Sequence, residues 1–362
     1  MKSTQEGLET VAQGWLHGIE RGLLHKRALK RPPQGITIEL TQRCNLSCKM
    51  CSYWKRPKDG LAHEKILSLL DEVRALGATG FYNCGTEPFM REDTPEILAY
   101  AERIGFREIP MVSNGALLNK GRRLEKLEKL KSLNIVISLD GPREVHDGLR
   151  GKGVYDEAVE ALREMRRRGI RCSISSVIMR QTVDSLKEIV DLAAGLGIPV
   201  IALQPYARFI SGPDNDHSSF EFLPEEEESL RKKLGDILDH AKSKNIRVYT
   251  ENMMSLVPSF LARGTRPMPA DGCLSPAKTF VVGISGETYP CVRWRGKSMG
   301  SVHDKTVPEI WYGAIHRELT GMAMDRKCPG CLSGCADMES FNSSLRNGSH
   351  AVKMVLKSLI GR

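Results

Sequence analysis

Ten cysteines are the residues of this 362-residue chain that point most directly to chemistry. Three of them form a C-x3-C-x2-C motif at Cys44, Cys48 and Cys51. Five more lie in the last quarter of the chain, and these are Cys273, Cys291, Cys328, Cys331 and Cys335. Met1-Lys2-Ser3 leads into polar sequence without an apolar segment, which predicts no secretory signal and a cytoplasmic location. Grouped cysteines in such a compartment indicate metal or redox chemistry rather than disulfides.

The spacing of the first group favours an iron–sulfur cluster. Zinc usually takes four ligands supplied as C-x2-C pairs. Three thiolates in one short loop, with no fourth cysteine or histidine nearby, instead predict a [4Fe–4S] cluster in which one iron is left open. An open iron is a site for chemistry and not only for electron storage.

The second group is ambiguous from spacing alone. Four cysteines drawn from it, at positions 273, 291, 328 and 331, satisfy either tetrahedral zinc or an iron–sulfur cluster. Cys335 then either replaces one of the last two ligands or is a free thiol. Two cysteines stand apart from both groups. Cys172 is expected in the core, and Cys84, at the end of a predicted strand, is of a residue type that is often a small buried side chain.

Alternating strands and helices are predicted to position the first group. The expected strands are Ile36–Leu40, Gly80–Cys84, Ile109–Ser113, Ile135–Leu139, Cys172–Ile178 and Val200–Pro205. The expected helices between them cover residues 63–76, 93–104, 119–132, 154–168 and 182–195. Such alternation predicts parallel βαβ units, with the chemistry at the carboxyl ends of the strands. Six repeats suit a partial barrel of the α/β class, too few for a closed eight-stranded one.

The chain divides into five predicted segments. Residues 1–33 form a basic helical segment, and residues 34–254 form the partial barrel with a further helix over 224–244. Residues 255–272, rich in proline and glycine, read as a linker. Residues 273–340 hold the second cysteine group, with a strand at 279–284 and a helix at 306–322. Residues 341–362 form a basic amphipathic helix.

Several short motifs at successive strand ends resemble those of one enzyme superfamily. Gly85-Thr86-Glu87-Pro88 ends the second strand, and Ser113-Asn114-Gly115 follows the third. Ser138-Leu139-Asp140-Gly141 ends the fourth, with Arg150-Gly151 a few residues later. With the cysteine loop, this order is similar to that of radical S-adenosylmethionine (SAM) enzymes over about residues 34–210.

The resemblance implies a cofactor and its contacts. Cys44, Cys48 and Cys51 would hold a [4Fe–4S] cluster that binds SAM and cleaves it reductively to a 5′-deoxyadenosyl radical. The SAM contacts it implies are Met50, Gly85, Thr86, Glu87, Pro88, Ser113, Asn114, Ser138, Asp140 and Arg150. Because Cys84 directly precedes Gly85, the resemblance also makes it a candidate hydrogen-atom donor to a substrate radical, the alternative to a buried small side chain. Two positions depart from the family pattern. Thr86 replaces a glycine and places a side chain where the backbone approaches the ligand, and Met50 replaces a common aromatic residue.

The second cysteine group resembles the SPASM/Twitch extension of radical SAM enzymes. That extension implies auxiliary [4Fe–4S] chemistry, with Cys273, Cys291, Cys328, Cys331 and Cys335 as the ligand candidates. Five cysteines instead of seven favour one auxiliary cluster and the smaller Twitch form, similar to that of a carbohydrate-oxidising dehydrogenase. The main expectation is therefore an enzyme that takes a hydrogen atom from a small polar substrate, such as a sugar, aminocyclitol or nucleotide, and oxidises, epimerises or rearranges it.

Other functions remain open on the sequence alone. One alternative is a maturase that cross-links, epimerises or oxidises a ribosomally made peptide, and another acts on a lipid-linked substrate at a membrane surface. A non-enzymatic metal-binding protein is disfavoured by the SAM motifs. Side chains after the fifth and sixth strands are candidates for substrate contact, and these are Arg180, Gln204, Tyr206 and Arg208. The resemblance also implies an electron donor such as flavodoxin or ferredoxin.

The net charge of +9 does not indicate a nucleic-acid partner. Residues 1–33 carry +3 of it and residues 341–362 carry +4, so the body of the chain is nearly neutral. A nucleic-acid enzyme is expected to carry positive charge on its folded body. The two basic terminal segments instead leave peripheral membrane contact open.

Overall fold

The computed structural model describes residues 30–208, 217–265 and 272–332. The predicted N-terminal helix over most of residues 1–33, the C-terminal helix over 341–362 and Cys335 lie outside these described residues.

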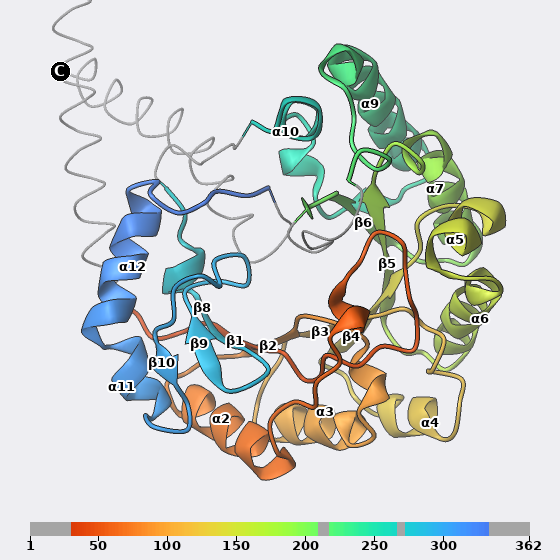
Figure 1. Ribbon diagram of the computed structural model, residues 1–362. Coiled ribbons are helices and arrows are strands. Elements are labelled where there is room, and N and C mark those ends of the chain that lie inside the picture. Colours follow the sequence, from red (N-terminus) through yellow and green to blue (C-terminus); the bar gives the residue numbers. More distant parts are fainter. Residues whose placement is uncertain (1–29, 209–216, 266–271, 333–362) are drawn as a thin grey trace, which may run out of the picture.

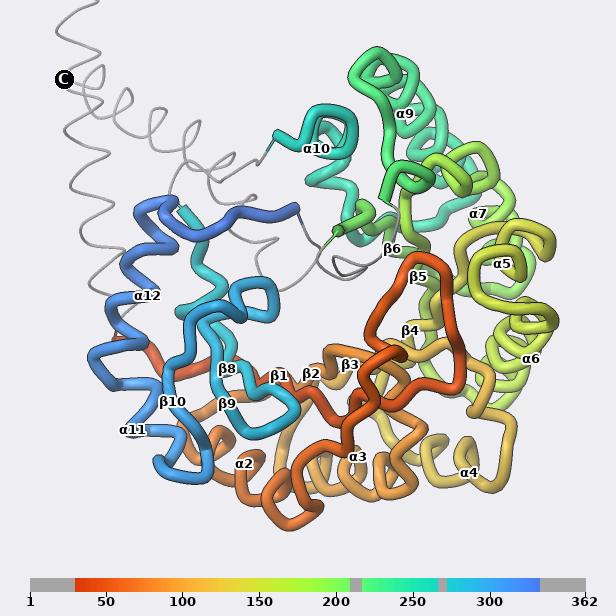
Figure 2. Tube along the Cα trace, viewed as in Figure 1, coloured from red at the N-terminus to blue at the C-terminus, as the bar shows by residue number. Residues whose placement is uncertain are grey.

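Six parallel strands form the partial barrel, as predicted (Figures 1 and 2). They are β1 (Gly35–Ile38), β2 (Gly80–Asn83), β3 (Ile109–Ser113), β4 (Leu133–Ser138), β5 (Cys172–Ile178) and β6 (Val200–Pro205). Strand β1 pairs with β2, and β3 to β6 pair in chain order, followed by the short β7 (Arg247–Val248). Phe81 N donates to Glu108 O at 2.8 Å, which joins β2 to the segment that leads into β3.

Amphipathic helices cover the outside of the strands (Figure 1). They are α2 (His63–Ala75), α3 (Thr94–Arg103), α4 (Arg123–Leu127), α5 (Arg143–Arg150), α6 (Val154–Arg167), α7 (Leu186–Gly195) and α9 (Glu227–Ser243). In α2 the buried positions are Ile66, Leu69, Leu70 and Val73. Their spacing of three or four residues places one apolar stripe against the strands, so each βα unit contributes to a common core.

The C-terminal domain continues the barrel sheet. Strand β8 (Thr279–Val282) pairs in parallel with β1, with Ile36 opposite Phe280. Strands β9 (Glu287–Tyr289) and β10 (Gly300–Ser301) add antiparallel pairs, and helices α11 (Val307–Trp311) and α12 (Ala314–Met324) follow. The second cysteine group is therefore built onto the first strand of the barrel.

Four parts of the structure differ from the sequence prediction. Residues 255–272 were predicted as a linker, but α10 (Val257–Arg263) lies there and packs beside α9. Pro258 lies in the first turn of this helix, where a missing backbone N–H has no cost. The helix predicted over 119–132 is shortened to α4, and the predicted helix over 306–322 is divided into α11 and α12. Helix α5 was not predicted.

Within the described part of the chain, none of the helices combines the length and the apolar character that a membrane span requires.

Candidate active site

The loop that carries the first three cysteines follows β1 at the carboxyl end of the strands. Lys49 N donates to a carbonyl at the end of α5 at 2.9 Å. Trp54 Nε1 donates to the carbonyl of Cys51 at 2.8 Å. Cys48 is buried, while Cys44 and Cys51 are half-buried. The first hydrogen bond ties the loop to α5, the second is made within the loop, and the three thiols are partly or fully withdrawn from water.

The chemistry of this donor set fits an iron–sulfur cluster. Burial raises the pKa of all three thiols, to about 11 for Cys44. A buried thiolate needs positive charge beside it. Arg150 supplies such a charge and opposes the effect of burial on the pKa of Cys48 and Cys51. Thiolates bound to iron are stabilised in the same way, by the charge of the metal.

A buried ion pair holds Arg150 in this position. Arg150 Nε donates to Asp140 Oδ2 at 2.6 Å, and Asp140 is fully buried after β4. Val177 N on β5 donates to the other carboxylate oxygen at 2.9 Å. The backbone N–H of Asp140 donates to Nδ1 of the buried His146 at 3.1 Å. Two residues that the motif predicts as SAM contacts thus form one rigid unit across β4, β5 and α5.

Glu87 braces the turn after β2 against the turn after β3. Its carboxylate accepts from Ser113 Oγ at 2.9 Å and from Asn114 N at 2.7 Å. Burial raises the pKa of Glu87 to about 7, against the lowering effect of these hydrogen bonds. Asn114 Nδ2 in turn donates to Asn45 Oδ1 in the cysteine loop at 2.9 Å. Three strand ends are therefore linked through predicted site residues.

Thr86, the departure from the family pattern, does not obstruct this turn. Its hydroxyl donates to Thr41 O at 2.8 Å, in the segment that leads into the cysteine loop. The preceding residue, Gly85, has φ +101°, a conformation that favours glycine. A Cβ on Gly85 would lie 3.1 Å from a carboxylate oxygen of Glu39. The threonine side chain therefore adds a tie between the turn and the loop.

A second buried ion pair joins the barrel to the C-terminal domain. Arg295 Nη1 donates to Glu39 Oε2 at 2.6 Å, and Glu39 is fully buried at the end of β1. Arg295 Nη2 also donates to Cys84 Sγ at 3.3 Å. Glu39 was not predicted as a site residue. Its position directly after the buried run Gly35–Ile38 could have indicated a buried carboxylate, and a buried charge needs a partner. Cys84 thus faces a guanidinium rather than apolar neighbours alone.

Four cysteines of the second group lie in the described residues, all of them half-buried. Cys273 N donates to Ala323 O at 3.1 Å, which places it beside the end of α12, shortly before Cys328. Cys291 follows β9 and accepts a hydrogen bond from Trp294 N at 3.2 Å through its carbonyl. Among the residues that the structure describes, no three His, Cys, Asp or Glu side chains converge closely enough to hold a single metal ion.

Three of the four side chains predicted to contact substrate bind residues between 217 and 226, in the segment before α9. Arg180 pairs with Glu226 at 2.5 Å, and Arg208 pairs with Glu221. Tyr206 Oη lies 2.8 Å from His217 Nδ1. Gln204 is near the end of β6. Both arginines are already matched by a carboxylate, so the expectation that they hold an anionic substrate group gains no support from their surroundings.

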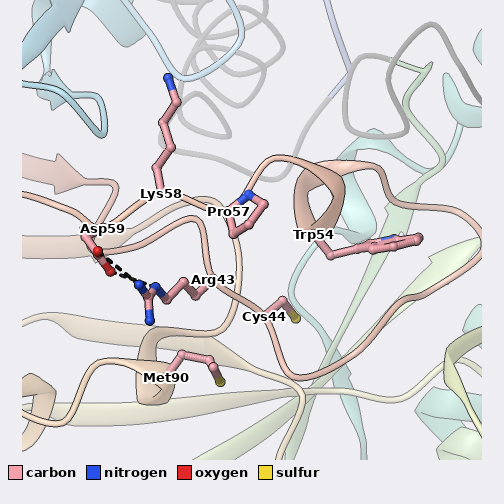
Figure 3. A pocket seen from close by; sticks show the side chains of 7 residues that line it. All are labelled: Arg43, Cys44, Trp54, Pro57, Lys58, Asp59 and Met90. Atoms are coloured by element: carbon pink, nitrogen blue, oxygen red, sulfur yellow. Dashed lines mark hydrogen bonds and ion pairs between the residues drawn. The ribbon is translucent and has the colours of Figure 1, made fainter.

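A cavity of about 420 Å³ lies beside the cysteine loop (Figure 3). Its lining residues are Arg43, Cys44, Trp54, Pro57, Lys58, Asp59 and Met90. Met50, predicted to pack against adenine, is buried and belongs to the hydrophobic core, and Ser138 lies half-buried at the end of β4. The cavity therefore reaches Cys44 from a part of the surface that the residues of the SAM motifs do not line.

Comparison with known proteins gives relatives along most of the chain. Fe-coproporphyrin III synthase of Methanosarcina barkeri is 27% identical over 79% of this chain and 75% of its own. PqqA peptide cyclase of Granulibacter bethesdensis is 27% identical over 78% of this chain and 75% of its own. The crystal structure of Streptococcus suis SuiB bound to precursor peptide SuiA has the same fold, with a TM-score of 0.66 over 89% of this chain and 74% of SuiB at 17% identity.

Two family models match the chain. The model of the radical SAM superfamily matches residues 38–193, and that of the SPASM iron–sulfur cluster-binding domain matches residues 273–335. The first spans the cysteine loop and the motifs after β2, β3 and β4. The second reaches Cys335, whereas the narrower Twitch form stays a prediction. The protein is an enzyme that uses SAM with a [4Fe–4S] cluster, and its second domain implies auxiliary iron–sulfur chemistry. The chain belongs to the radical SAM superfamily and carries a C-terminal SPASM domain.

Proposed function

We propose that this enzyme modifies a peptide by radical chemistry. The observation that carries the proposal is the alignment with a peptide cyclase along three-quarters of both chains. The fold shared with SuiB, a structure solved with its precursor peptide, agrees with it. Peptide modification thus replaces the small polar substrate as the main reading.

In this proposal the three cysteines of the first loop hold the cluster, and the cluster when bound supplies the electron that cleaves SAM. Arg150 balances the negative charge of the thiolates, while Asp140 holds its guanidinium in place at 2.6 Å. Glu87 and Thr86 fix the turn after β2, whose backbone faces the SAM site. The residues themselves orient the ligand and exclude water, and the cofactor carries the bond-breaking chemistry.

The open barrel is compatible with a long substrate. Strands β7 and β10 end their sheets, and neither pairs with a further strand among the described residues. A barrel of this kind is not closed by hydrogen bonds between its first and last strands, so an extended chain can reach the carboxyl ends of the strands from the side. The carboxylate-paired Arg180 and Arg208 also favour a substrate without a strong anionic group at this rim.

A tetrapyrrole substrate is the second candidate. It is favoured by one specific finding, the alignment of 79% of the chain with Fe-coproporphyrin III synthase. The two candidates differ in chemistry, because a porphyrin presents carboxylates and a flat apolar ring, whereas a peptide presents backbone amides.

The test is SAM turnover with defined substrates. The protein is reconstituted with iron and sulfide without oxygen and given dithionite and SAM. Synthetic peptides from the short reading frames that flank its gene are compared with iron coproporphyrin III. We expect peptide to raise 5′-deoxyadenosine formation at least tenfold and to be modified at a residue that tandem mass spectrometry locates. Modification of the porphyrin alone would replace the proposal by the second candidate.

A further inference from the structure

One side chain of the SPASM domain reaches the barrel beside the predicted SAM turn. Arg295 lies on the loop after β9, four residues beyond Cys291. Two of its nitrogens donate to the barrel, Nη1 to Glu39 Oε2 at 2.6 Å and Nη2 to Cys84 Sγ at 3.3 Å. The third, Nε, donates to the carbonyl of Val292 in its own loop at 3.3 Å. The planar guanidinium is therefore held in one orientation between the two domains.

Both barrel partners of Arg295 adjoin the turn Gly85–Pro88, which contains four of the predicted SAM contacts. Cys84 directly precedes Gly85 in the chain. The Glu39 side chain lies close to Gly85 itself, because a Cβ on this glycine would be 3.1 Å from Glu39 Oε1 and 3.2 Å from its Cγ. A shift of Glu39 or Cys84 would therefore be passed directly to the main chain of the turn.

Glu39 connects the same guanidinium to the cysteine loop. Its Oε1 accepts from Gln42 Nε2 at 3.0 Å, two residues before Cys44. Its Oε2, which accepts from Arg295, also accepts from the backbone N–H of Ile284 after β8 at 3.2 Å. Glu39 is fully buried. One carboxylate thus receives hydrogen bonds both from the start of the cysteine loop and from the SPASM domain.

The positive charge of Arg295 stabilises this carboxylate where it lies. A buried charge is costly unless it is paired and hydrogen-bonded, and removing one partner of a buried pair is strongly destabilising. Without the guanidinium, Glu39 would be expected to turn toward water or to draw water in. Either movement would change the surface on which Gly85 rests.

We propose that Arg295 is a positioning residue for SAM. Through it, the SPASM domain holds Glu39 and Cys84 against the turn after β2 and so completes the SAM site of the barrel. Arg295 acts in this role through these two residues, and no bond, electron or proton is transferred. The inference goes beyond the proposed function, because it concerns the binding of SAM and applies whatever the substrate is.

SAM affinity without turnover tests the proposal. Anaerobically reconstituted protein is dialysed against radiolabelled SAM in the absence of a reductant, so that SAM binds without being cleaved. We expect Arg295→Met to raise the dissociation constant of SAM about tenfold or more, since small misplacements of binding groups have effects of this size. Arg295→Lys restores a positive charge beside Glu39 and should stay within about threefold of the wild type.

Kinetics supply a second readout that a loss of folded protein would not produce. Under dithionite, the KM for SAM of Arg295→Met should rise in parallel with the dissociation constant. At saturating SAM, its rate of 5′-deoxyadenosine formation should return to about half of the wild-type rate or more. A misplaced turn weakens SAM binding, whereas a smaller folded fraction would lower kcat and leave KM unchanged.

A matched variant separates SAM positioning from domain contact in general. Glu72 on α2 accepts from the backbone N–H of Val307 at 2.7 Å, which joins the barrel to the SPASM domain through a covering helix. Glu72→Met removes this contact and none of the hydrogen bonds of Glu39 or Cys84. Its dissociation constant for SAM should stay within about twofold of the wild type, and iron content should be equal in all variants.

A neutral double variant carries the test if Arg295→Met does not fold. Glu39→Gln/Arg295→Met leaves no unpaired carboxylate but still lacks the guanidinium, so SAM should bind it about threefold more weakly than the wild type, or worse. Wild-type affinity in Arg295→Met, or in the double variant if only that one folds, would overturn the proposal. An equal loss in Glu72→Met would do so as well, because it would indicate a general effect of domain contact. Loss of iron from Arg295→Met would assign the effect to the cluster instead of the turn.

Discussion

Two buried ion pairs of nearly equal geometry differ in what they connect. Arg150 meets Asp140 and Arg295 meets Glu39, each at 2.6 Å with a fully buried carboxylate. The first pair joins residues 10 positions apart within the barrel, and the second joins residues 256 apart across two domains. The arginine is 11% exposed in the first and 27% in the second. The Arg150–Asp140 pair, here called the inner pair, places a positive charge beside the cysteine loop. The Arg295–Glu39 pair, here called the outer pair, joins the SPASM domain to the end of β1.

Removing Arg150 should have the largest effect. Arg150→Met leaves the charge of Asp140 buried without its partner, which typically costs about 3–5 kcal/mol of unfolding free energy. Urea denaturation of the wild type and the variant measures this cost. Arg143→Met, at the exposed pair with Asp156, serves as the control and should unfold almost like the wild type. A small loss for Arg150→Met would mean that Asp140 becomes protonated or reaches water.

Removing Arg295 should cost less, because this side chain is closer to water. We expect Arg295→Met to lose about 2–3 kcal/mol of unfolding free energy. The double variant Glu39→Gln/Arg295→Met should recover part of this loss, with a coupling energy of about 1–3 kcal/mol in a double-mutant cycle. Protease cleavage in the β8–β9 region should increase in the single variant if the pair fixes the domain. Unchanged cleavage would mean that the pair does not hold the SPASM domain on the barrel.

Acid should lower the free energy of unfolding through His146, which lies next to the inner pair. Burial lowers the pKa of His146 from 6.5 to about 4, so the folded state favours the neutral ring. Between these values the unfolded chain binds more protons, and stability should fall as the pH drops from 6.5 towards 4. The contribution is up to about 1.4 kcal/mol per pH unit. Unfolding at pH 7 and pH 5 measures it, and His146→Gln should flatten the difference. An equal slope in that variant would assign the effect to other groups.

The smallest effect should come from Thr86, close to the outer pair. Thr86→Val keeps the shape but removes the hydrogen bond to Thr41 O, so about 1 kcal/mol of unfolding free energy should be lost. Thr86→Gly restores the residue of the family pattern and should lose at least as much, because it also frees the unfolded chain. If Thr86→Gly is the more stable protein, the threonine strains the turn instead of tying it.

The comparison of the two pairs also shows what the sequence could predict. Strands β3, β5 and β6 were predicted to the residue, because short apolar runs end at turn residues. Asp140 and Arg150 were predicted from a local motif. The contact between Glu39 and Arg295 was not predicted, because no local pattern links residues 256 positions apart. The parallel pairing of β1 with β8 brings them together.

Other misses have equally local causes. Helix α5 is rich in charge and buries only His146 and Leu149, so its apolar stripe is too short to stand out. Helix α10 lies in a proline-rich stretch, where Pro258 occupies a first-turn position and starts the helix instead of breaking it. The carboxylates that neutralise Arg180 and Arg208 come from a later segment of the chain, so the charge state of that rim could not be predicted from the strand ends.

The central claim is that Cys44, Cys48 and Cys51 hold the [4Fe–4S] cluster at which SAM is cleaved. The most direct test is iron content and 5′-deoxyadenosine formation under dithionite, in the wild type and in the variant with all three cysteines changed to alanine. The account predicts about eight irons in the wild type and about four in the variant, since each [4Fe–4S] cluster holds four. The nucleoside should form only with the wild type. Nucleoside formation by the alanine variant, or zinc in place of iron in the wild type, would contradict the claim.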